Sequence, residues 1–393
     1  MHKIIFTEEF CQPENLYPFT LTRHLQDIRV GILTIREKWE KLLQLPSFNK
    51  KEDTYKDTPA SVDLVEAVQN GDCYLIHGNV LPTPALVQAV QQLQHGQVIT
   101  TIDGLHIIYK LSKQDINEQK QIKVNQSIPF HQPLHIIQHP WDIFNKNDWA
   151  IREDFALIVN QRISQSIPGF VQTQQSENIF IEEGASIGLG TIINAATGPV
   201  YIGKNVTIME GTIIRGPFAI GEGAVLKMGA KIYGATTIGP YSVVGGEIKN
   251  SVIFGHSNKA HDGYLGDAVI GEWCNIGAGV SNSNLKNTAN DVFIWQPKGK
   301  HNAGKKCGVL MGDYARVAIN TSINTGTVIG VGANVFTNGL TPKFIPSFAW
   351  GIDDTTKYDF DKALEHINNW KKLKHSSVTT TEKNLLNYIY NHI

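Results

Sequence analysis

The stretch that decides the fold is IGKNVTIMEGTIIRGPFAIGEGAVLKMGAKIYGATTIGPYSVV, residues 202–244. Every sixth residue in it is aliphatic: Ile202, Ile208, Ile214, Ile220, Leu226, Ile232, Ile238 and Val244. This period matches neither the alternation of an ordinary strand nor the repeat of an amphipathic helix. It is typical of a hexapeptide-repeat parallel β-helix, in which short strands stack coil on coil and each coil buries one aliphatic residue per face. A β-sandwich is the alternative, and the unbroken series disfavours it.

The six-residue repeat is looser before this stretch and is interrupted twice after it. Residues 181–193 keep an irregular phase, as expected of a coil that caps the stack. The repeat fails between residues 245 and 269 and again between 281 and 307, and it resumes from Met311 to Val335. Because segments inserted into a solenoid usually carry its binding function, we look for chemistry in these two interruptions.

The chain before the repeat reads as an α/β domain. We expect a strand at residues 3–10, a strand that turns into a helix within 28–45, a strand at 73–82, a helix at 81–96 that ends at Gly96, and two strands within 97–111. Strands that alternate with helices favour a mainly parallel sheet, with its binding crevice at the carboxyl ends of the strands. Residues 140–163 are expected to be helical and to connect the domains, and the tail from Asp353 also reads as helical.

The composition limits the partners. The 393 residues carry 35 Lys and Arg against 36 Asp and Glu, so the formal net charge of -1 predicts neither nucleic acid nor an anionic membrane as a partner. No apolar run approaches the roughly 20 residues of a membrane span, and the N-terminal residues lack the zones of a signal peptide, so we expect a cytoplasmic protein. The four cysteines lack CxxC spacing, which predicts buried thiols rather than disulfides or a zinc site.

A resemblance to a known family lies in residues 247–284, EIKNSVIFGHSNKAHDGYLGDAVIGEWCNIGAGVSNSN. This segment resembles the active-site segment of the bifunctional bacterial enzymes that acetylate glucosamine-1-phosphate and then make UDP-N-acetylglucosamine. The resemblance implies an α/β nucleotidyltransferase-like (Rossmann-like) domain at residues 1–170, a left-handed parallel β-helix acyltransferase domain at 171–352 and a helical tail at 353–393. Over the N-terminal half it is a resemblance of layout more than of motif.

The family pattern identifies candidate residues for acetyl transfer and for the sugar phosphate. In that family a histidine, followed three residues later by a tyrosine and then by Leu-Gly-Asp, carries the transfer, and His261 and Tyr264 match it. The lysine that holds the sugar phosphate corresponds to Lys249, and an arginine one coil earlier corresponds to Lys231. We expect these two lysines to lie one above the other and to clamp a phosphate by charge.

The resemblance also implies contacts with the sugar and with the acyl donor. Two asparagines that contact the sugar and the cofactor correspond to Asn275 and Asn284, respectively, and an alanine beside the acetyl-CoA thioester corresponds to Ala278. A serine that contacts the cofactor falls on Ile319, which departs from the pattern. The basic segment 297–306 is a further candidate, for the pyrophosphate of coenzyme A.

Acyl transfer to an amine requires a base, because a protonated ammonium has no lone pair with which to attack. Histidine suits this task, since its ordinary pKa of about 6.5 lets it take a proton near neutral pH. We expect His261 to be the base and nearby His256 to be structural. The oxyanion would be stabilised by a backbone N–H of the turn at residues 277–279 or by the Tyr264 hydroxyl, and the sequence does not choose between them.

The N-terminal domain departs from its presumed relatives. They carry a glycine-rich loop after the first strand that holds nucleotide phosphates, whereas residues 7–19 here, TEEFCQPENLYPF, contain no glycine. Candidate substitutes are Arg23, Arg29 and Lys38. In the position of the family's magnesium-binding aspartate the chain has Asn79, a poor ligand, and Asp103 has only weak support, so we assign no metal ligand.

The leading interpretation is an enzyme of sugar-nucleotide biosynthesis. It would use acetyl-CoA to acetylate an amino sugar phosphate. A possible second reaction is uridylyl transfer from UTP, with Mg²⁺ as the metal cofactor. The enzyme would work as a homotrimer, because a prism with flat faces suits contacts that close a ring. Two alternatives remain open. One is a non-catalytic sugar-phosphate-binding or regulatory protein, and the other is an acyltransferase that acts on a nucleotide-linked amino sugar.

Overall fold

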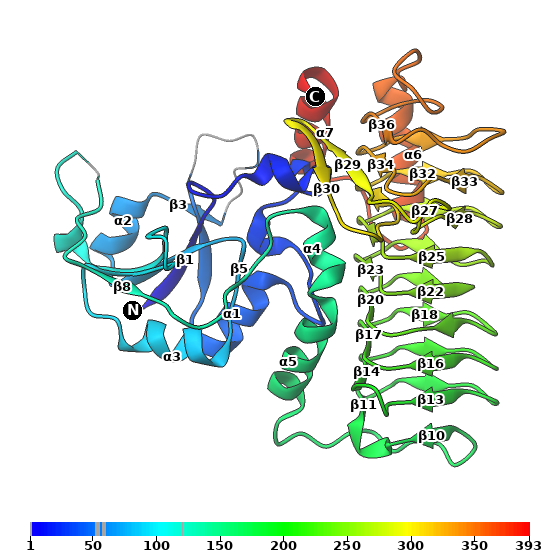
Figure 1. Cartoon of the computed structure of the whole chain (residues 1–393), viewed down its shortest axis with the longest axis horizontal. Helices are drawn as coiled ribbons and strands as arrows, with labels where there is room; N and C mark the ends of the chain where they lie inside the picture. Colours follow the sequence, from blue (N-terminus) through cyan, green and yellow to red (C-terminus); the bar gives the residue numbers. More distant parts are fainter. Residues whose placement is uncertain (1, 52–55, 57–59, 120) are drawn as a thin grey trace. The chain divides into compact units, whose positions relative to one another are not determined.

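The computed structural model describes residues 2–51, 56, 60–119 and 121–393. Contacts divide the chain into two units, which are drawn in Figure 1 and described separately below. The first unit consists of residues up to Pro13 together with Arg23–Ile28 and Leu33–Gln138, and the second, here called the β-helix unit, of Glu14–Thr22, Arg29–Ile32 and His139–Ile393. The expected domain boundary near residue 170 stays a prediction.

A seven-stranded sheet forms the first unit, in the order β3-β2-β1-β4-β7-β6-β8. The strands are β1 (Lys3–Thr7), β2 (Ser47–Lys50), β3 (Ser61–Val62), β4 (Cys73–His77), β6 (Gln97–Thr100), β7 (His106–Leu111) and β8 (Gln126–Pro129). The first four strands in this order pair in parallel, whereas β7 is antiparallel to both β4 and β6. The sheet is therefore mixed, because the two strands expected within residues 97–111 form a hairpin. A short pair, β5 (Val80–Leu81) and β9 (His135–Ile136), lies outside this sheet.

Three α-helices belong to the first unit: α1 (Ile35–Leu43), α2 (Leu64–Gln69) and α3 (Pro84–Gln92). Each begins after a side chain that accepts a hydrogen bond from a free N–H of the first turn, namely Thr34, Asp63 and Thr83. Helix α3 ends before Gly96, which adopts a positive φ of 73° in the turn that leads into β6. The strand expected before α1 is absent, and residues 29–32 belong to the other unit.

The β-helix unit is a left-handed parallel β-helix with three faces (Figure 1). The six-stranded face contains β10 (Gln172–Gln174), β13 (Ile192–Asn194), β16 (Ile213–Arg215), β19 (Lys231–Ile232), β22 (Glu247–Lys249) and β25 (Tyr264–Gly266). The eight-stranded face contains β12 (Ser186–Ile187), β15 (Thr207–Ile208), β18 (Val225–Leu226), β21 (Val243–Val244), β24 (Asn258–Lys259), β27 (Asn275–Ile276), β32 (Arg316–Val317) and β35 (Asn334–Val335). The nine-stranded face contains β11 (Ile179–Ile181), β14 (Val200–Ile202), β17 (Phe218–Ile220), β20 (Thr236–Ile238), β23 (Val252–Ile253), β26 (Val269–Ile270), β31 (Leu310–Met311), β34 (Val328–Ile329) and β36 (Phe344–Ile345).

The aliphatic series of the sequence forms the core of this prism. Successive members lie on successive faces, with Ile202 on the nine-stranded face, Ile208 on the eight-stranded face and Ile214 on the six-stranded face. All eight members from Ile202 to Val244 are at most 2% exposed. The prediction of the β-helix and of its inward positions is thus confirmed.

The two interruptions differ in kind. Residues 245–270 do not leave the helix, because β22 to β26 continue all three faces with shorter corners, and Gly246 with a positive φ of 78° turns one of them. The expectation of an inserted loop there is therefore wrong. The second interruption does leave the coil, as the antiparallel hairpin β29 (Phe293–Gln296) and β30 (Gly299–Asn302). It follows β28 (Ser281–Asn282), which pairs with β33 (Ser322–Ile323).

Helices cover parts of the β-helix. Helices α4 (Pro140–Asn145) and α5 (Asn147–Val159) run along the nine-stranded face (Figure 1), and the buried Asn147 side chain donates to the carbonyl of Ala235 at 2.9 Å. The tail forms α6 (Phe360–Lys372) and α7 (Thr380–His392). In the part of the chain that the structure describes, no helix combines the length and the apolar character needed to cross a membrane.

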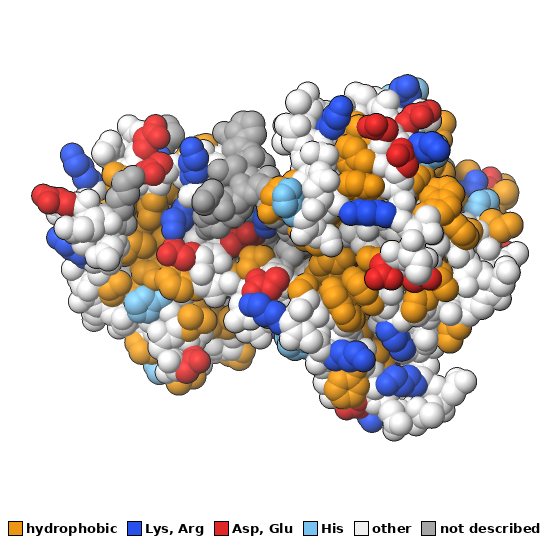
Figure 2. All heavy atoms as spheres, turned by 90° about the horizontal axis from the view of Figure 1, so that it is seen from above, with side chains coloured by type: hydrophobic (Ala, Val, Ile, Leu, Met, Phe, Trp, Pro, Cys, Tyr) orange, Lys and Arg blue, Asp and Glu red, His pale blue; other side chains and the backbone are white. Residues whose placement is uncertain are grey.

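The cysteines are unpaired thiols, as the sequence predicts, and the charges on the surface are mixed in sign. All four cysteines are free thiols; Cys73, Cys274 and Cys307 are buried and Cys11 is half-buried. On the face drawn in Figure 2, basic and acidic side chains are scattered in small groups among hydrophobic ones, without a large area of one sign. This distribution fits the net charge of -1.

Candidate functional site

A pocket of about 510 Å³ lies on the eight-stranded face of the β-helix, at its corner with the six-stranded face. It gathers His261, Asn275 and Ala278, which the sequence predicts to be site residues, and also Ile319. The residues come from β21, β24, β27 and the adjoining corner turns, and residues 370–374 of the tail complete the wall. The pocket therefore combines residues from several coils with residues of the tail that lie at least 51 positions later in the sequence.

His261 lies in the corner turn between β24 and β25. Its side chain is exposed to the pocket, and no hydrogen bond of its imidazole is found among the described residues. Its backbone is held, because the carbonyl of His261 accepts a hydrogen bond from the Lys259 ammonium. The imidazole nitrogens therefore remain available to a ligand in the pocket.

His256, which the sequence suggests is structural, lies on the other side of this coil. Its ring is stacked between Tyr241, at a centroid distance of 5.2 Å, and Trp273, at 4.2 Å. Burial, together with the positive charges of Lys374 and Lys371, lowers the pKa of His256 to about 4. A neutral, sandwiched ring at neutral pH is a packing element.

The turn at residues 277–279 offers one backbone donor to the pocket. The N–H of Gly277 donates to the carbonyl of Val317 at 2.9 Å, and that of Gly279 donates to the carbonyl of Asp262 at 3.1 Å. The N–H of Ala278 makes no backbone hydrogen bond within the described ranges. Of the three N–H groups of this turn, that of Ala278 is therefore the one that no backbone carbonyl accepts, and the Tyr264 hydroxyl stays the other candidate for the oxyanion.

Tyr264 belongs to a second polar cluster, behind the turn. Its hydroxyl is 3.1 Å from the amide nitrogen of Asn284, which also donates to the buried carboxylate of Asp267 at 2.5 Å. Asn250 donates to the other oxygen of Asp267 at 2.6 Å. Burial and the Asp267 charge raise the pKa of Tyr264, so its hydroxyl stays protonated and can donate. Asp267, whose role the sequence analysis missed, fixes the amide of Asn284.

The two asparagines are grouped differently from the expectation. The sequence assigns Asn275 to the sugar and Asn284 to the cofactor, but the structure places Asn275 in the pocket beside Ala278 and Asn284 against Tyr264. Asn275 pairs in register with Asn258 and Arg316 on the eight-stranded face. Asn275 thus lies beside a residue expected to contact the cofactor, and Asn284 lies beside a residue expected to bind the sugar.

The two candidate lysines lie on the six-stranded face, but not one above the other. Lys231 pairs in register with Glu247, and Lys249 pairs with Gly266. Both side chains are exposed and point away from the core, two residues apart along the strand direction. The predicted stacking is therefore wrong, because the coil after Val244 is shorter than six residues per face.

The end of α6 and the residues that follow it supply a wall that the sequence analysis missed. The guanidinium of Arg316 lies 5.7 Å from the centre of the Trp370 ring. The Lys374 ammonium donates to the carbonyls of Tyr241 at 2.6 Å and His256 at 3.0 Å, and to the side chain of Asn258 at 3.0 Å. Burial lowers the pKa of Lys374 to about 8. These contacts fix residues 370–374 over the pocket.

The basic segment 297–306 has partners of its own. Lys298 forms an ion pair with Glu14, and Lys305 forms one with Asp291 at 2.9 Å. Both lysines are exposed, so the pairs are screened by solvent. Their charges are partly offset before any coenzyme binds.

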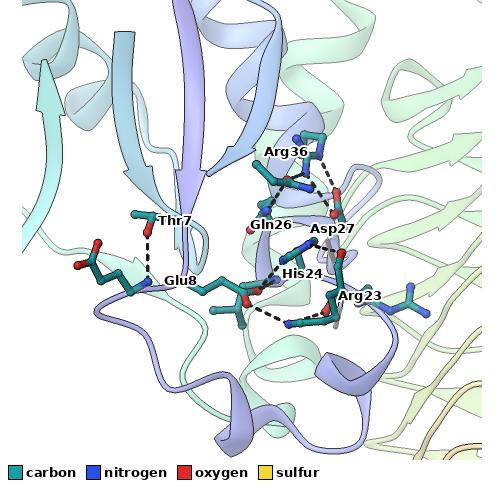
Figure 3. Close-up of polar contacts among 11 residues, drawn as sticks. Thr7, Glu8, Arg23, His24, Gln26, Asp27 and Arg36 are labelled. Carbon is teal, nitrogen blue, oxygen red and sulfur yellow. Dashed lines mark hydrogen bonds and ion pairs between the residues drawn. The ribbon is translucent and has the colours of Figure 1, made fainter. Parts of the chain in front are cut away.

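A buried polar cluster occupies the start of the loop after β1 in the first unit (Figure 3). The carboxylate of Glu8 accepts the backbone N–H of Leu25 at 2.6 Å, and it lies 2.9 Å from the ammonium of Lys56 and 3.5 Å from the ring of His24. Burial alone would raise the pKa of Glu8, but the His24 hydrogen bond, the Lys56 charge and the Leu25 N–H outweigh it and lower the pKa to about 2.

The nucleotidyltransferase candidates of the sequence occupy different surroundings. Arg23 is half-buried, and its carbonyl lies 3.4 Å from the Lys56 ammonium; Lys38 is buried in α1. Arg29 belongs to the β-helix unit and donates to the carbonyl of Ile32. Arg36, which the sequence analysis did not single out, binds Asp27 through two nitrogens, at 2.6 and 3.2 Å (Figure 3).

The residues present do not fit a magnesium site. The side-chain oxygen of Asn79 accepts the Cys11 thiol at 3.2 Å, and the exposed Asp103 carboxylate accepts the Thr101 hydroxyl. Within the described ranges, no three His, Cys, Asp or Glu side chains are grouped so that they could hold a metal ion.

Comparisons with known proteins cover both parts of this description. Residues 4–163 match the family model described as "Sugar nucleotidyl transferase". The "Bifunctional protein GlmU" of Synechococcus elongatus is 25% identical over 234 residues, 53% of this chain and 52% of the relative. The "Bifunctional sugar-1-phosphate nucleotidylyltransferase/acetyltransferase" of Sulfurisphaera tokodaii is 29% identical over 205 residues, 51% of this chain and 44% of the relative. The matched part is thus about half the length of these relatives.

One solved structure, described as "Activity and Crystal Structure of Arabidopsis UDP-N-acetylglucosamine acyltransferase", is 13% identical, covers 51% of this chain and 76% of that chain, and has a TM-score of 0.28. The sequence relatives, however, confirm the resemblance read from residues 247–284: the chain is similar to the family of bifunctional sugar-1-phosphate nucleotidyltransferase and acetyltransferase proteins.

Proposed function

We propose that the β-helix unit transfers an acetyl group from acetyl-CoA to the amine of a sugar phosphate of the glucosamine-1-phosphate type. The observation that carries the proposal is the pocket that brings His261, Asn275 and Ala278 together. Similarity to proteins named as bifunctional nucleotidyltransferase and acetyltransferase supports the same reaction class.

The chemistry follows from the positions of these groups. His261 removes a proton from the ammonium of the sugar, and the free amine attacks the thioester carbon. The oxyanion that forms accepts a hydrogen bond from the Ala278 N–H, a kind of interaction worth about 3 kcal/mol when a donor is removed. The C–S bond then breaks, the imidazolium returns its proton to the leaving thiolate, and the nitrogen of the new amide gives its remaining extra proton to solvent. The products are the amide and free coenzyme A.

The acceptor is best identified with a panel of amino sugars. The protein is incubated with acetyl-CoA and with free, phosphorylated or nucleotide-linked amino sugars, and thiol release is followed. We expect the fastest release with the sugar phosphate. Fastest release with a nucleotide-linked sugar would support the alternative acceptor, and no release with any sugar would support a non-catalytic binding protein.

Lys249 is proposed to attract the sugar phosphate. It is exposed on the six-stranded face, and the ring and hydroxyl of Tyr264 lie over its neighbour in register, Gly266, so its ammonium adjoins another residue expected to bind the sugar. Lys249→Met is expected to raise the KM for the sugar phosphate about tenfold, because one charge-assisted contact with the phosphate is lost. The KM for acetyl-CoA should stay within about twofold. The control is Lys204→Met, because Lys204 is an exposed lysine several coils away. Steady-state kinetics measure both variants, and the same KM for the sugar phosphate in both would contradict the assignment.

A second candidate function is nucleotidyl transfer by the first unit. The match of residues 4–163 to the sugar nucleotidyl transferase family supports it. The loop after β1 argues against the usual mechanism, because it lacks glycine and its Glu8 is engaged with Leu25 and Lys56. Release of pyrophosphate from UTP and N-acetylglucosamine-1-phosphate, measured over a range of Mg²⁺ concentrations, tests this activity. A blank result at every concentration would exclude it.

A homotrimer is proposed as the working assembly. Exposed apolar side chains line the outside of the six-stranded face and its corners, with Ile192 and Ile213 paired in register and Leu189 and Met228 more than 60% exposed. Such a surface is typical of an interface between copies. Light scattering at micromolar concentration is expected to give the mass of three chains for the wild type and a smaller mass for Ile213→Lys. A monomeric wild type would contradict the proposal.

A further inference from the structure

The eight-stranded face contains a charged residue in its row of inward-facing aliphatic residues. Seven of its eight inward positions hold Ile, Leu or Val: Ile187, Ile208, Leu226, Val244, Ile276, Val317 and Val335. The eighth is Lys259, which pairs with Val244 in register and is 2% exposed. Burying an ammonium costs free energy unless its donors are satisfied, so this lysine needs a reason for its position.

Lys259 joins two corners of adjacent coils. Its ammonium donates to the carbonyl of His261, two residues ahead, and to the carbonyl of Gly245 at 3.3 Å, one coil earlier. Among the described residues, neither carbonyl accepts another backbone hydrogen bond. Burial lowers the pKa of Lys259 to about 8, and the charge of Asp262 acts in the opposite direction. The group is therefore mainly an ammonium at neutral pH, with three donors.

We propose that Lys259 is a positioning residue that holds the turn of His261 against the preceding coil, and so fixes the imidazole in the pocket. An aliphatic residue in its place would continue the core but would leave the carbonyls of His261 and Gly245 without a donor. The turn at residues 260–263 would then be free to shift. A displacement of the order of 1 Å costs about 10²-fold in rate in other enzymes.

The kinetic part of this inference rests on the proposed acetyl transfer. Lys259→Met is expected to lower kcat about 10- to 100-fold, with the KM for acetyl-CoA and for the sugar phosphate within about twofold, because the proton transfer and not the binding is disturbed. The control is Leu226→Met, in the same inward row of the eight-stranded face but two coils earlier, and it should keep the wild-type kcat. Equal kcat for Lys259→Met and the wild type would overturn the proposal.

Hydrogen exchange separates this inference from the proposed function. In the full-length chain, the amides of residues 260–264 are expected to exchange at least tenfold faster in Lys259→Met than in the wild type, and at the wild-type rate in Leu226→Met. Unchanged exchange would refute the positioning role even if the wild type proved inactive, whereas faster exchange in an inactive protein would refute only the acetyl transfer. If Lys259→Met does not fold, Lys259→Leu, which also lacks a donor and matches the aliphatic residues of the same row, takes its place with the same readouts and the same overturning results.

Discussion

Replacement of His261 by alanine is expected to lower kcat for acetyl transfer by about 10²- to 10⁴-fold, the usual contribution of a general base. The imidazole is the titratable side chain that the corner turn exposes to the pocket, next to the Ala278 N–H and Asn275. Since the side chain is exposed and makes no hydrogen bond to the described residues, its removal leaves the fold intact. Steady-state thiol release with saturating substrates measures the effect.

His392→Ala is the matched control for this variant. His392 is exposed at the end of α7 and does not line the pocket, so its loss is expected to leave kcat within about twofold. Full turnover by His261→Ala would remove His261 from the mechanism.

Replacement of Glu8 by glutamine is expected to reduce the free energy of unfolding of the first unit by about 3 kcal/mol at neutral pH, because it removes the buried carboxylate that lies 2.9 Å from the ammonium of Lys56. The neighbouring Glu9→Gln is the matched control. Glu9 pairs with Lys50 at the exposed surface, and such pairs contribute about 0 to 1 kcal/mol. Urea unfolding of the full chain is monitored by hydrogen exchange of the amides in β1 and β4, which reports the unfolding transition of this unit alone.

The pH dependence of the Glu8 effect has a definite sign. The pKa of Glu8 is lowered from 4.5 to about 2 in the folded state, so its stabilisation is fully present above pH 4.5 and is lost as the pH falls toward 2. The difference between the wild type and Glu8→Gln should therefore shrink over that window. A Glu8→Gln protein as stable as Glu9→Gln at neutral pH would show that the cluster is not a structural element of the unit.

The β-helix could be predicted in detail because its sequence signal is geometric. Each aliphatic residue from Ile202 to Val244 marks an inward position, and the spacing fixes the face on which it lies. The register after Val244 could not be predicted, because the break in the hydrophobic repeat does not show how many residues each corner loses. For this reason Lys231 and Lys249 seemed aligned, and Lys259 was not recognised as part of the core.

The rest of the site depends on long-range packing. Nothing in the periodicity of residues 360–372 tells which face of the β-helix the helix covers, so the contribution of Trp370 and Lys374 to the pocket was missed. In the first unit, β1, β4 and α3 were predicted, but hydrophobicity does not reveal pairing direction, and the antiparallel β7 was not expected. The strand expected before α1 fails because the N–H groups of Gly31 and Ile32 donate to side chains, those of Asn147 and Asp154, instead of to a neighbouring strand.

The central claim, that the pocket around His261 acetylates an amino sugar phosphate, is tested most directly by the product of the reaction. The wild type and His261→Ala are incubated side by side with acetyl-CoA and glucosamine-1-phosphate, and the sugar is examined by mass spectrometry. We predict that the wild type adds one acetyl group to the sugar nitrogen and that His261→Ala adds almost none in the same time. A sugar that stays unmodified with the folded wild type, or is modified equally by both proteins, would contradict the account.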